Sequence, residues 1–100
     1  MRTAAVPTPP DAEWSRAIDS LVFTPDGHRG RCVVHRLAFR ALLGLRQPEP
    51  ADGLAHFAAH RAAYQRAAAR KIVDRGLPPD ASLHLTSRAV QRALEETASA

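Results

Sequence analysis

The sequence predicts a small single-domain α+β protein with a β-hairpin, two helices, a third strand and a C-terminal helix. Two short apolar runs flank the turn-forming residues Pro25, Asp26 and Gly27, a pattern typical of a hairpin. Segments with the helical spacing of apolar residues follow, and a short alternating run separates the last two. We therefore expect a mainly antiparallel sheet packed on the longest helix.

Length and composition predict one domain between two short ends. The chain has 100 residues, 45% of them hydrophobic and 24% charged, as in an ordinary globular domain. Residues 1–10 are small, polar and proline-rich and predict a flexible arm, and residues 97–100 predict a frayed tail. The domain then spans residues 11–96. Since only 5% of the residues are aromatic, we expect a small core that is marginally stable or supported by oligomerisation.

The domain is expected to open with a turn and the hairpin. Asp11 is a candidate cap for a short turn that runs through Trp14 and Ile18. Residues 21–24 predict the first strand, and residues 31–34 predict the strand that returns from the hairpin turn.

A short, unusually apolar helix is predicted over residues 36–43 and ends at Gly44. Only Arg36 and Arg40 mark a hydrated edge. A helix that is apolar around most of its axis is buried on more than one side. In so small a protein, a second copy of the chain is a candidate for covering one side, which makes a homodimer one expected assembly.

The longest predicted helix spans residues 53–75, begins at the cap Asp52 and ends before a glycine. At 100° per residue, six of its residues share one apolar stripe: Leu54, Phe57, Ala58, Tyr64, Ala68 and Ile72. The alternation of residues 83–85 predicts the third strand, and Thr86 or Ser87 is expected to cap the final helix.

Charge, cysteine content and motifs narrow the function class. The net charge is +4, but each half of the chain carries 7 basic and 5 acidic residues, and no stretch is apolar enough to span a membrane. Cys32 is the only cysteine, and no secretory signal is evident, so a cytoplasmic location is expected. Without a nucleophile, phosphate-loop or paired-carboxylate motif, neither catalysis nor a cofactor is predicted.

Nineteen residues, spread in a fixed order from the hairpin to the start of the last helix, resemble the pattern of a known family. They are Val22, Phe23, Asp26, Gly27, Cys32, Val34, Leu37, Leu42, Leu43, Gly44, Phe57, His60, Arg61, Ala67, Lys71, Leu83, Leu85, Thr86 and Ser87. Over residues 11–96 this combination resembles the small bacterial proteins of domain-of-unknown-function family 1488. The resemblance implies an α+β fold with a mainly antiparallel sheet, and no activity. The chain departs from the family at His35, where members tend to have a serine cap, and at residues 4–6, a poor counterpart of the members' first strand.

Arg61 is the most unusual residue of the longest predicted helix, because it falls inside the apolar stripe between Phe57 and Tyr64. A buried guanidinium without a partner is costly. Arg61, with His60 and Tyr64, is therefore a candidate ion-pair, ligand or interface site. Three aspartates are candidate partners of the guanidinium: Asp19, Asp26 and Asp80.

The second half of the same helix carries three candidate phosphate contacts, Arg66, Arg70 and Arg75. Arg66 and Arg70 point outward, whereas Lys71 and Arg75 lie near the apolar stripe, and no base-reading motif accompanies them. Basic residues near a helix C-terminus also complement the helix dipole. Nucleic acid is thus a candidate partner that the sequence does not favour.

Two further candidates are a thiol and a histidine pair. Cys32 is either a reactive thiol, which requires exposure and a lowered pKa, or a small core residue beside Val34. His56 and His60, four residues apart on one helical face, are weak metal-ligand candidates, with His84 a third ligand only if the fold brings it close.

The observations together favour a small, non-enzymatic interaction or accessory module with an unidentified protein partner. The alternatives are a nucleic-acid-associated regulator that uses the basic helix and a thiol-based activity at Cys32.

Overall fold

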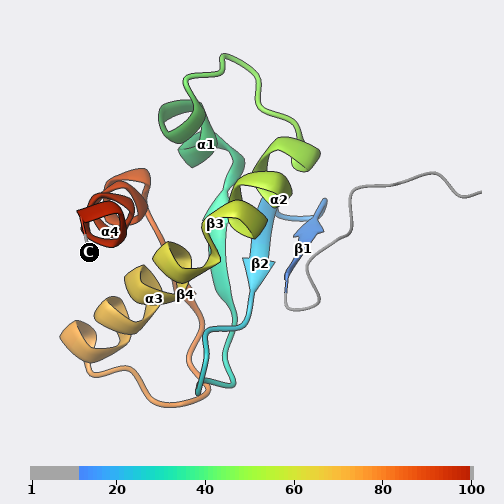
Figure 1. Cartoon of the computed structure of the whole chain (residues 1–100). Coiled ribbons are helices and arrows are strands. Elements are labelled where there is room, and N and C mark those ends of the chain that lie inside the picture. Colours follow the sequence, from blue (N-terminus) through green and yellow to red (C-terminus); the bar gives the residue numbers. More distant parts are fainter. Residues whose placement is uncertain (1–11, 100) are drawn as a thin grey trace, which may run out of the picture.

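A four-stranded sheet and four helices build residues 12–99, the part of the chain that the computed structural model describes (Figure 1). In chain order they are β1 (Ala12–Ser15), β2 (Ser20–Phe23), β3 (Cys32–His35), α1 (Arg36–Leu43), α2 (Pro50–Ala59), α3 (Arg61–Arg75), β4 (Leu83–His84) and α4 (Ser87–Ser99). The strand order is β1-β2-β3-β4, antiparallel except for the parallel β3–β4 pair. This is the predicted α+β fold; the predicted arm, residues 1–10, lies outside the described residues.

The hairpin of β2 and β3 is present as predicted. Its antiparallel register places Phe23 opposite Cys32, on the face that packs against the helices. Gly27 in the turn adopts a φ of 73°, a left-handed conformation that a glycine takes without steric cost. Local turn chemistry and strand propensity therefore agree with the tertiary structure here.

The turn expected through Trp14 and Ile18 is confirmed only around Ile18. Residues 16–19 form a turn, whereas residues 12–15 form strand β1. β1 pairs antiparallel with β2, and Trp14 lies opposite Leu21. The Trp14 ring centroid lies 6.1 Å from that of Phe39, so the pairing brings a large aromatic side chain to the core. The pairing also satisfies backbone groups along the edge of β2, and these tertiary contacts outweigh a local turn.

The single helix predicted over residues 53–75 is also wrong, because the structure has two helices, α2 and α3. Helix α2 starts earlier, at Pro50, and Asp52 accepts a hydrogen bond of 2.8 Å from the Glu49 amide from inside the first turn. At His60 the backbone leaves the helical region, with φ −128° and ψ 35°. As a result α2 packs on β1 and β2, whereas α3 packs on α4 (Figure 1).

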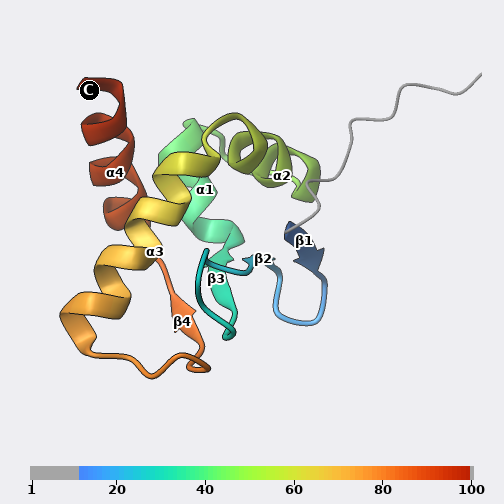
Figure 2. The ribbon, with the colours of Figure 1, turned by 60° about the horizontal axis from the view of Figure 1, so that its bottom comes forward.

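The core lies between the sheet and the helices. Figure 2 shows α2 and α3 on the same side of the strands, with α4 packed alongside α3. The largest buried side chains in this layer are Tyr64, Phe23, Phe39, Phe57, Leu21, Val34 and Val90. No helix among the described residues has the length and apolar character needed to cross a membrane.

The segment between α3 and β4 lies against the hairpin loop. The Arg29 amide donates a hydrogen bond of 2.8 Å to the Pro79 carbonyl, and Nε2 of His28 lies 2.7 Å from the Ala81 carbonyl oxygen. A Cβ added at Gly30 would lie 2.0 Å from that same oxygen. The close approach of two backbone segments therefore requires glycine at this position.

Helix α4 begins at one of its two predicted caps and runs further than predicted. The Thr86 hydroxyl oxygen accepts a hydrogen bond of 3.1 Å from the Ala89 amide. The helix continues to Ser99, so residues 97–99, which the sequence assigns to a frayed tail, are helical. The Thr97 hydroxyl donates back to the Leu94 carbonyl at 3.1 Å.

Candidate functional site

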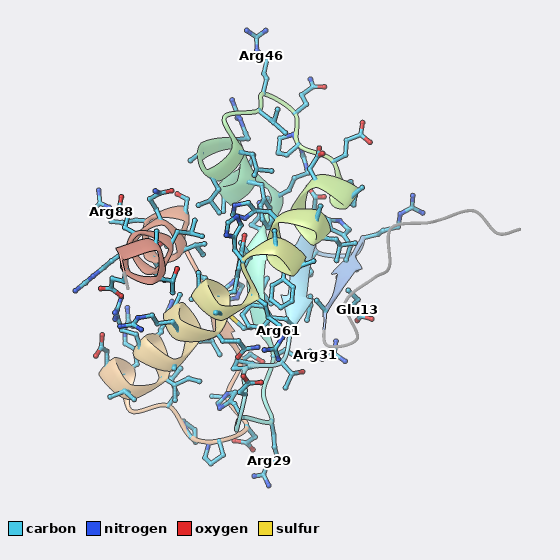
Figure 3. The ribbon with its side chains drawn as sticks, in the orientation of Figure 1. Glu13, Arg29, Arg31, Arg46, Arg61 and Arg88 are labelled. Carbon is cyan, nitrogen blue, oxygen red and sulfur yellow. The ribbon has the colours of Figure 1, made fainter. Side chains whose placement is uncertain are left out.

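Arg61 lies at the start of α3 and holds the hairpin turn. Its Nη2 lies 3.0 Å from Oδ1 of Asp26, one of the three aspartates considered as partners, and Figure 3 shows it directed toward the hairpin. One turn further along α3, Oε1 of Gln65 accepts a hydrogen bond of 2.7 Å from the Asp26 amide. The helix break at His60 changes the phase of the helix, so the Arg61 side chain is 46% exposed and lies outside the apolar stripe in which the sequence placed it. Of the roles considered for Arg61, the structure shows the ion pair.

The histidine pair lies at the junction of α2 and α3. The rings of His56 and His60 are 4.6 Å apart, and Nδ1 of His56 is 2.7 Å from the hydroxyl oxygen of buried Tyr64. Partial burial, and then the nearby His60, lower the pKa of His56 below its ordinary value, and burial raises that of Tyr64. His56 is therefore a half-buried residue that packs against Tyr64.

The candidate metal site is not assembled. Across residues 12–99, no group of three histidine, cysteine, aspartate or glutamate side chains lies close enough to hold a metal ion. His84 is exposed on β4 and does not complete a set with His56 and His60. The Tyr64 hydroxyl occupies one ring nitrogen of His56 instead.

Cys32 lies on the core face of β3 and is fully buried, as is Val34 two residues further. Burial raises the pKa of the Cys32 thiol to about 12, although the charge of Lys71 acts in the opposite direction. A reactive thiol needs a lowered pKa and exposure, and Cys32 has neither. This geometry fits the core interpretation and gives no support to thiol chemistry.

Glu96 on α4 pairs with two of the three basic residues that the sequence suggested as phosphate contacts. Its Oε1 lies 3.0 Å from Nε of Arg66 and also accepts a hydrogen bond from Arg70, while its Oε2 lies 3.5 Å from Nε of Arg92. Hydrogen bonding from Arg70 is the main cause that lowers the pKa of Glu96. Glu96 therefore links α4 to α3 through its ion pairs with Arg66 and Arg70.

The three predicted phosphate contacts do not share one surface. Arg75 follows Arg70 by five residues, which rotates it by about 140° around α3. Arg66 and Arg70 face α4, where Glu96 binds them. A continuous basic face for a nucleic-acid backbone is thus absent from α3.

A small hollow lies between α3 and α4, and we call it the α3–α4 hollow. It measures about 220 Å³ and is lined by Ala67, Arg70, Thr86, Arg88, Ala89 and Arg92. Its position beside Glu96 places three arginines from two helices around one cavity. Of these arginines, the sequence suggests only Arg70.

A larger groove lies on the other side of α4, against α1, and we call it the α1–α4 groove. It measures about 380 Å³ and is lined by Ala41, Leu42, Ser87, Arg88, Gln91, Arg92 and Glu95. Leu37 lies one helical turn before Ala41 on the same face and is 53% exposed, although the sequence predicts an α1 buried on most sides. Within residues 12–99, Phe39 is buried, whereas the face of α1 that carries Leu37 and Ala41 is exposed.

Helix α4 supplies the residues that sequence reasoning missed. Arg88, Arg92 and Glu96 recur every four residues, so they follow one side of the helix. That spacing was the available signal, but it is also the spacing of an ordinary solvated face. Because α4 packs against both α1 and α3, Arg88 and Arg92 line both cavities, and Glu96 pairs with arginines of α3.

The comparisons add no relative. No protein-family model, curated protein or solved structure matches the chain. The resemblance to domain-of-unknown-function family 1488 accordingly stays a prediction.

Proposed function

We propose that the chain is a non-enzymatic interaction module that binds an acidic amphipathic helix of a partner protein in the α1–α4 groove. The observation that carries the proposal is the exposed apolar face of α1 beside that groove, flanked by arginines. Leu37 and Ala41 supply the apolar contact. An exposed apolar surface with a polar rim is the usual sign of an interaction site.

Charge favours an acidic partner over a second copy of the chain. Arg40 flanks Leu37 on one side, and Arg88 and Arg92 rim the groove on the other. Glu95 also lines the groove, so its rim is net positive rather than uniformly basic. A symmetric dimer through this face would bring like charges together in a chain of net charge +4, whereas an acidic helix would complement them.

The proposal retains two expectations from the sequence. A bacterial cytoplasm is the proposed location, since the single, buried Cys32 is compatible with a reducing compartment. A homodimer remains the alternative occupant of the exposed face of α1. The nucleic-acid alternative has less support, because Arg75 is rotated by about 140° from Arg70 around α3, so the three arginines do not form one continuous basic face.

Photo-crosslinking in the cells of origin tests the groove. A benzophenone-bearing residue replaces Ala41 in the groove or, as a control, Val73, an exposed apolar position on α3. We expect one covalent adduct with another protein from position 41 and none from position 73. Arg88→Glu should reduce this adduct at least tenfold, and Arg29→Glu should leave it unchanged, because Arg29 lies in the hairpin loop away from the groove (Figure 3).

Four outcomes would overturn the proposal. An adduct with twice the mass of the chain would identify a homodimer. Equal adducts from positions 41 and 73, or no adduct from either, would show that the groove is not a specific docking surface. An adduct that Arg88→Glu leaves undiminished would exclude the acidic character of the partner.

A further inference from the structure

The α3–α4 hollow has cationic walls and a small floor. Arg70 comes from α3, and Arg88 and Arg92 come from α4. Ala67 and Ala89 line the same cavity, and their methyl groups leave room for a compact group between the arginines. The Arg70 side chain is only 29% exposed and is held by Glu96, so one of the three guanidinium groups is already positioned.

The single negative charge of Glu96, the carboxylate beside the hollow, does not neutralise the positive charge of the surrounding arginines. Arg66, Arg70 and Arg92 all bind Glu96, and Arg88 forms no ion pair within the described part of the chain. Three guanidinium groups contact Glu96, and Arg88 adds a fourth at the other end of the hollow, while Glu95 also lies near Arg88 and Arg92. Four positive charges against two carboxylates leave an excess of two in this cluster. An excess of this size at a cavity attracts a multivalent anion.

We propose that the α3–α4 hollow binds the phosphate group of a small phosphate monoester, with Arg70, Arg88 and Arg92 as its ligands. Guanidinium groups present paired N–H donors that match phosphate oxygens, and a dianion offers acceptors enough for all three. The N-terminal end of α4, at Thr86, lies at the same cavity, and its dipole adds to the attraction.

The shape of the site favours a terminal phosphate over a nucleic-acid backbone. The three arginines surround a single hollow of about 220 Å³ instead of following a line along one helix. Arg75, which would have to extend the track along α3, is rotated away from Arg70. A phosphodiester also carries one charge per phosphate, whereas a monoester carries nearly two at neutral pH.

Titration with phenyl phosphate, followed by amide NMR shifts, tests the site. We expect saturable shifts at Ala67, Thr86 and Ala89, and weaker shifts of the same amides with inorganic phosphate. Arg88→Ala should weaken binding at least tenfold, and Arg70→Ala should do the same. The control is Arg29→Ala, which removes one positive charge at a position that Figure 3 places far from Arg88 and should change affinity less than twofold.

Glu96→Gln gives a second test with the opposite sign. Because this change removes the carboxylate that competes for Arg70 and Arg92, phenyl phosphate should bind several-fold more tightly. Glu13→Gln is the matched control, since Glu13 pairs with exposed Arg31 on the sheet. A purely structural role for Glu96 would weaken binding or leave it unchanged.

Several results would overturn the proposal. These are the absence of saturable shifts around the hollow, equal affinity in Arg88→Ala and the unchanged chain, and weaker or unchanged binding in Glu96→Gln. Tight binding of duplex DNA that requires Arg75, without binding of phenyl phosphate, would assign the arginines to nucleic acid instead.

Discussion

At the scale of single residues, burial determines the chemistry of the side chains that looked reactive. Cys32 and Tyr64 both lie in the core, and burial raises the pKa of each. His56 lies half-buried against Tyr64 and has a lowered pKa. These side chains therefore contribute to packing and stability. Two predictions follow from the burial of Cys32 and His56.

Cys32 should resist alkylation in the folded chain. Its pKa of about 12 leaves little thiolate at pH 8, so iodoacetamide should react on the order of 1,000-fold more slowly than with the chain unfolded in guanidinium chloride. Mass spectrometry of timed samples measures both rates. Comparable rates in the two states would mean that the β3 face of the sheet opens readily.

His56 should make the fold less stable in mild acid. Its folded pKa lies below the ordinary value of about 6.5, so the unfolded chain binds its proton first as the pH falls through that value. Stability from this group is complete above pH 6.5 and declines between that pH and the lower folded pKa. Thermal unfolding between pH 8 and pH 5 should show a shallower loss in His56→Gln.

His84→Gln is the matched control for that measurement, because His84 is an exposed histidine on β4. It should retain the pH dependence of the unchanged chain. If both variants lost the dependence equally, or if neither did, the half-buried His56 could not be its source.

At the scale of elements, close backbone approach and helix direction matter more than local propensity. Gly30→Ala should destabilise the fold by more than about 3 kcal/mol, because the new methyl group would overlap the Ala81 carbonyl oxygen, which also contacts His28. Gly27→Ala, at a left-handed position with open space, should cost about 1 kcal/mol. Urea denaturation of the two variants measures the difference.

A Gly30→Ala cost no larger than that of Gly27→Ala would show that the segment joining α3 to β4 can move away from the hairpin. The parallel β3–β4 pair would then be the weakest part of the sheet. Amide hydrogen exchange at Leu83 and Leu85, whose amides donate to the Arg31 and Val33 carbonyls, provides an independent readout.

At the scale of the whole molecule, the arrangement of charge decides what can assemble with it. Arg40, Arg88 and Arg92 surround the open face of α1, so the isolated chain should remain a monomer of 10.9 kDa in light scattering after size exclusion. Leu37 and Val73 are both exposed apolar residues, so Val73→Glu is the matched control for Leu37→Glu. A stable dimer that Leu37→Glu dissociates and Val73→Glu leaves intact would favour the homodimer.

Local patterns were sufficient to predict much of the fold. The hairpin turn at Gly27, the short helix α1 over residues 36–43 and the cap at Thr86 depend on contacts within a few residues, and all three were predicted. The α+β class and the mainly antiparallel sheet follow from the order of these elements. The sequence by itself therefore determined the class of the fold, but not the membership of its core, since Ala58 of the predicted apolar stripe and Leu37 are exposed.

Only the tertiary structure decided the rest. Strand β1 pairs with β2 and packs Trp14 on Phe39, and the helix break at His60 directs α2 and α3 to different partners. The candidate sites depend on the same packing, since Arg70 and Arg88 meet only where α3 and α4 lie side by side. Contacts between residues distant in the chain have no signature in local spacing, which is why the sequence could not show them.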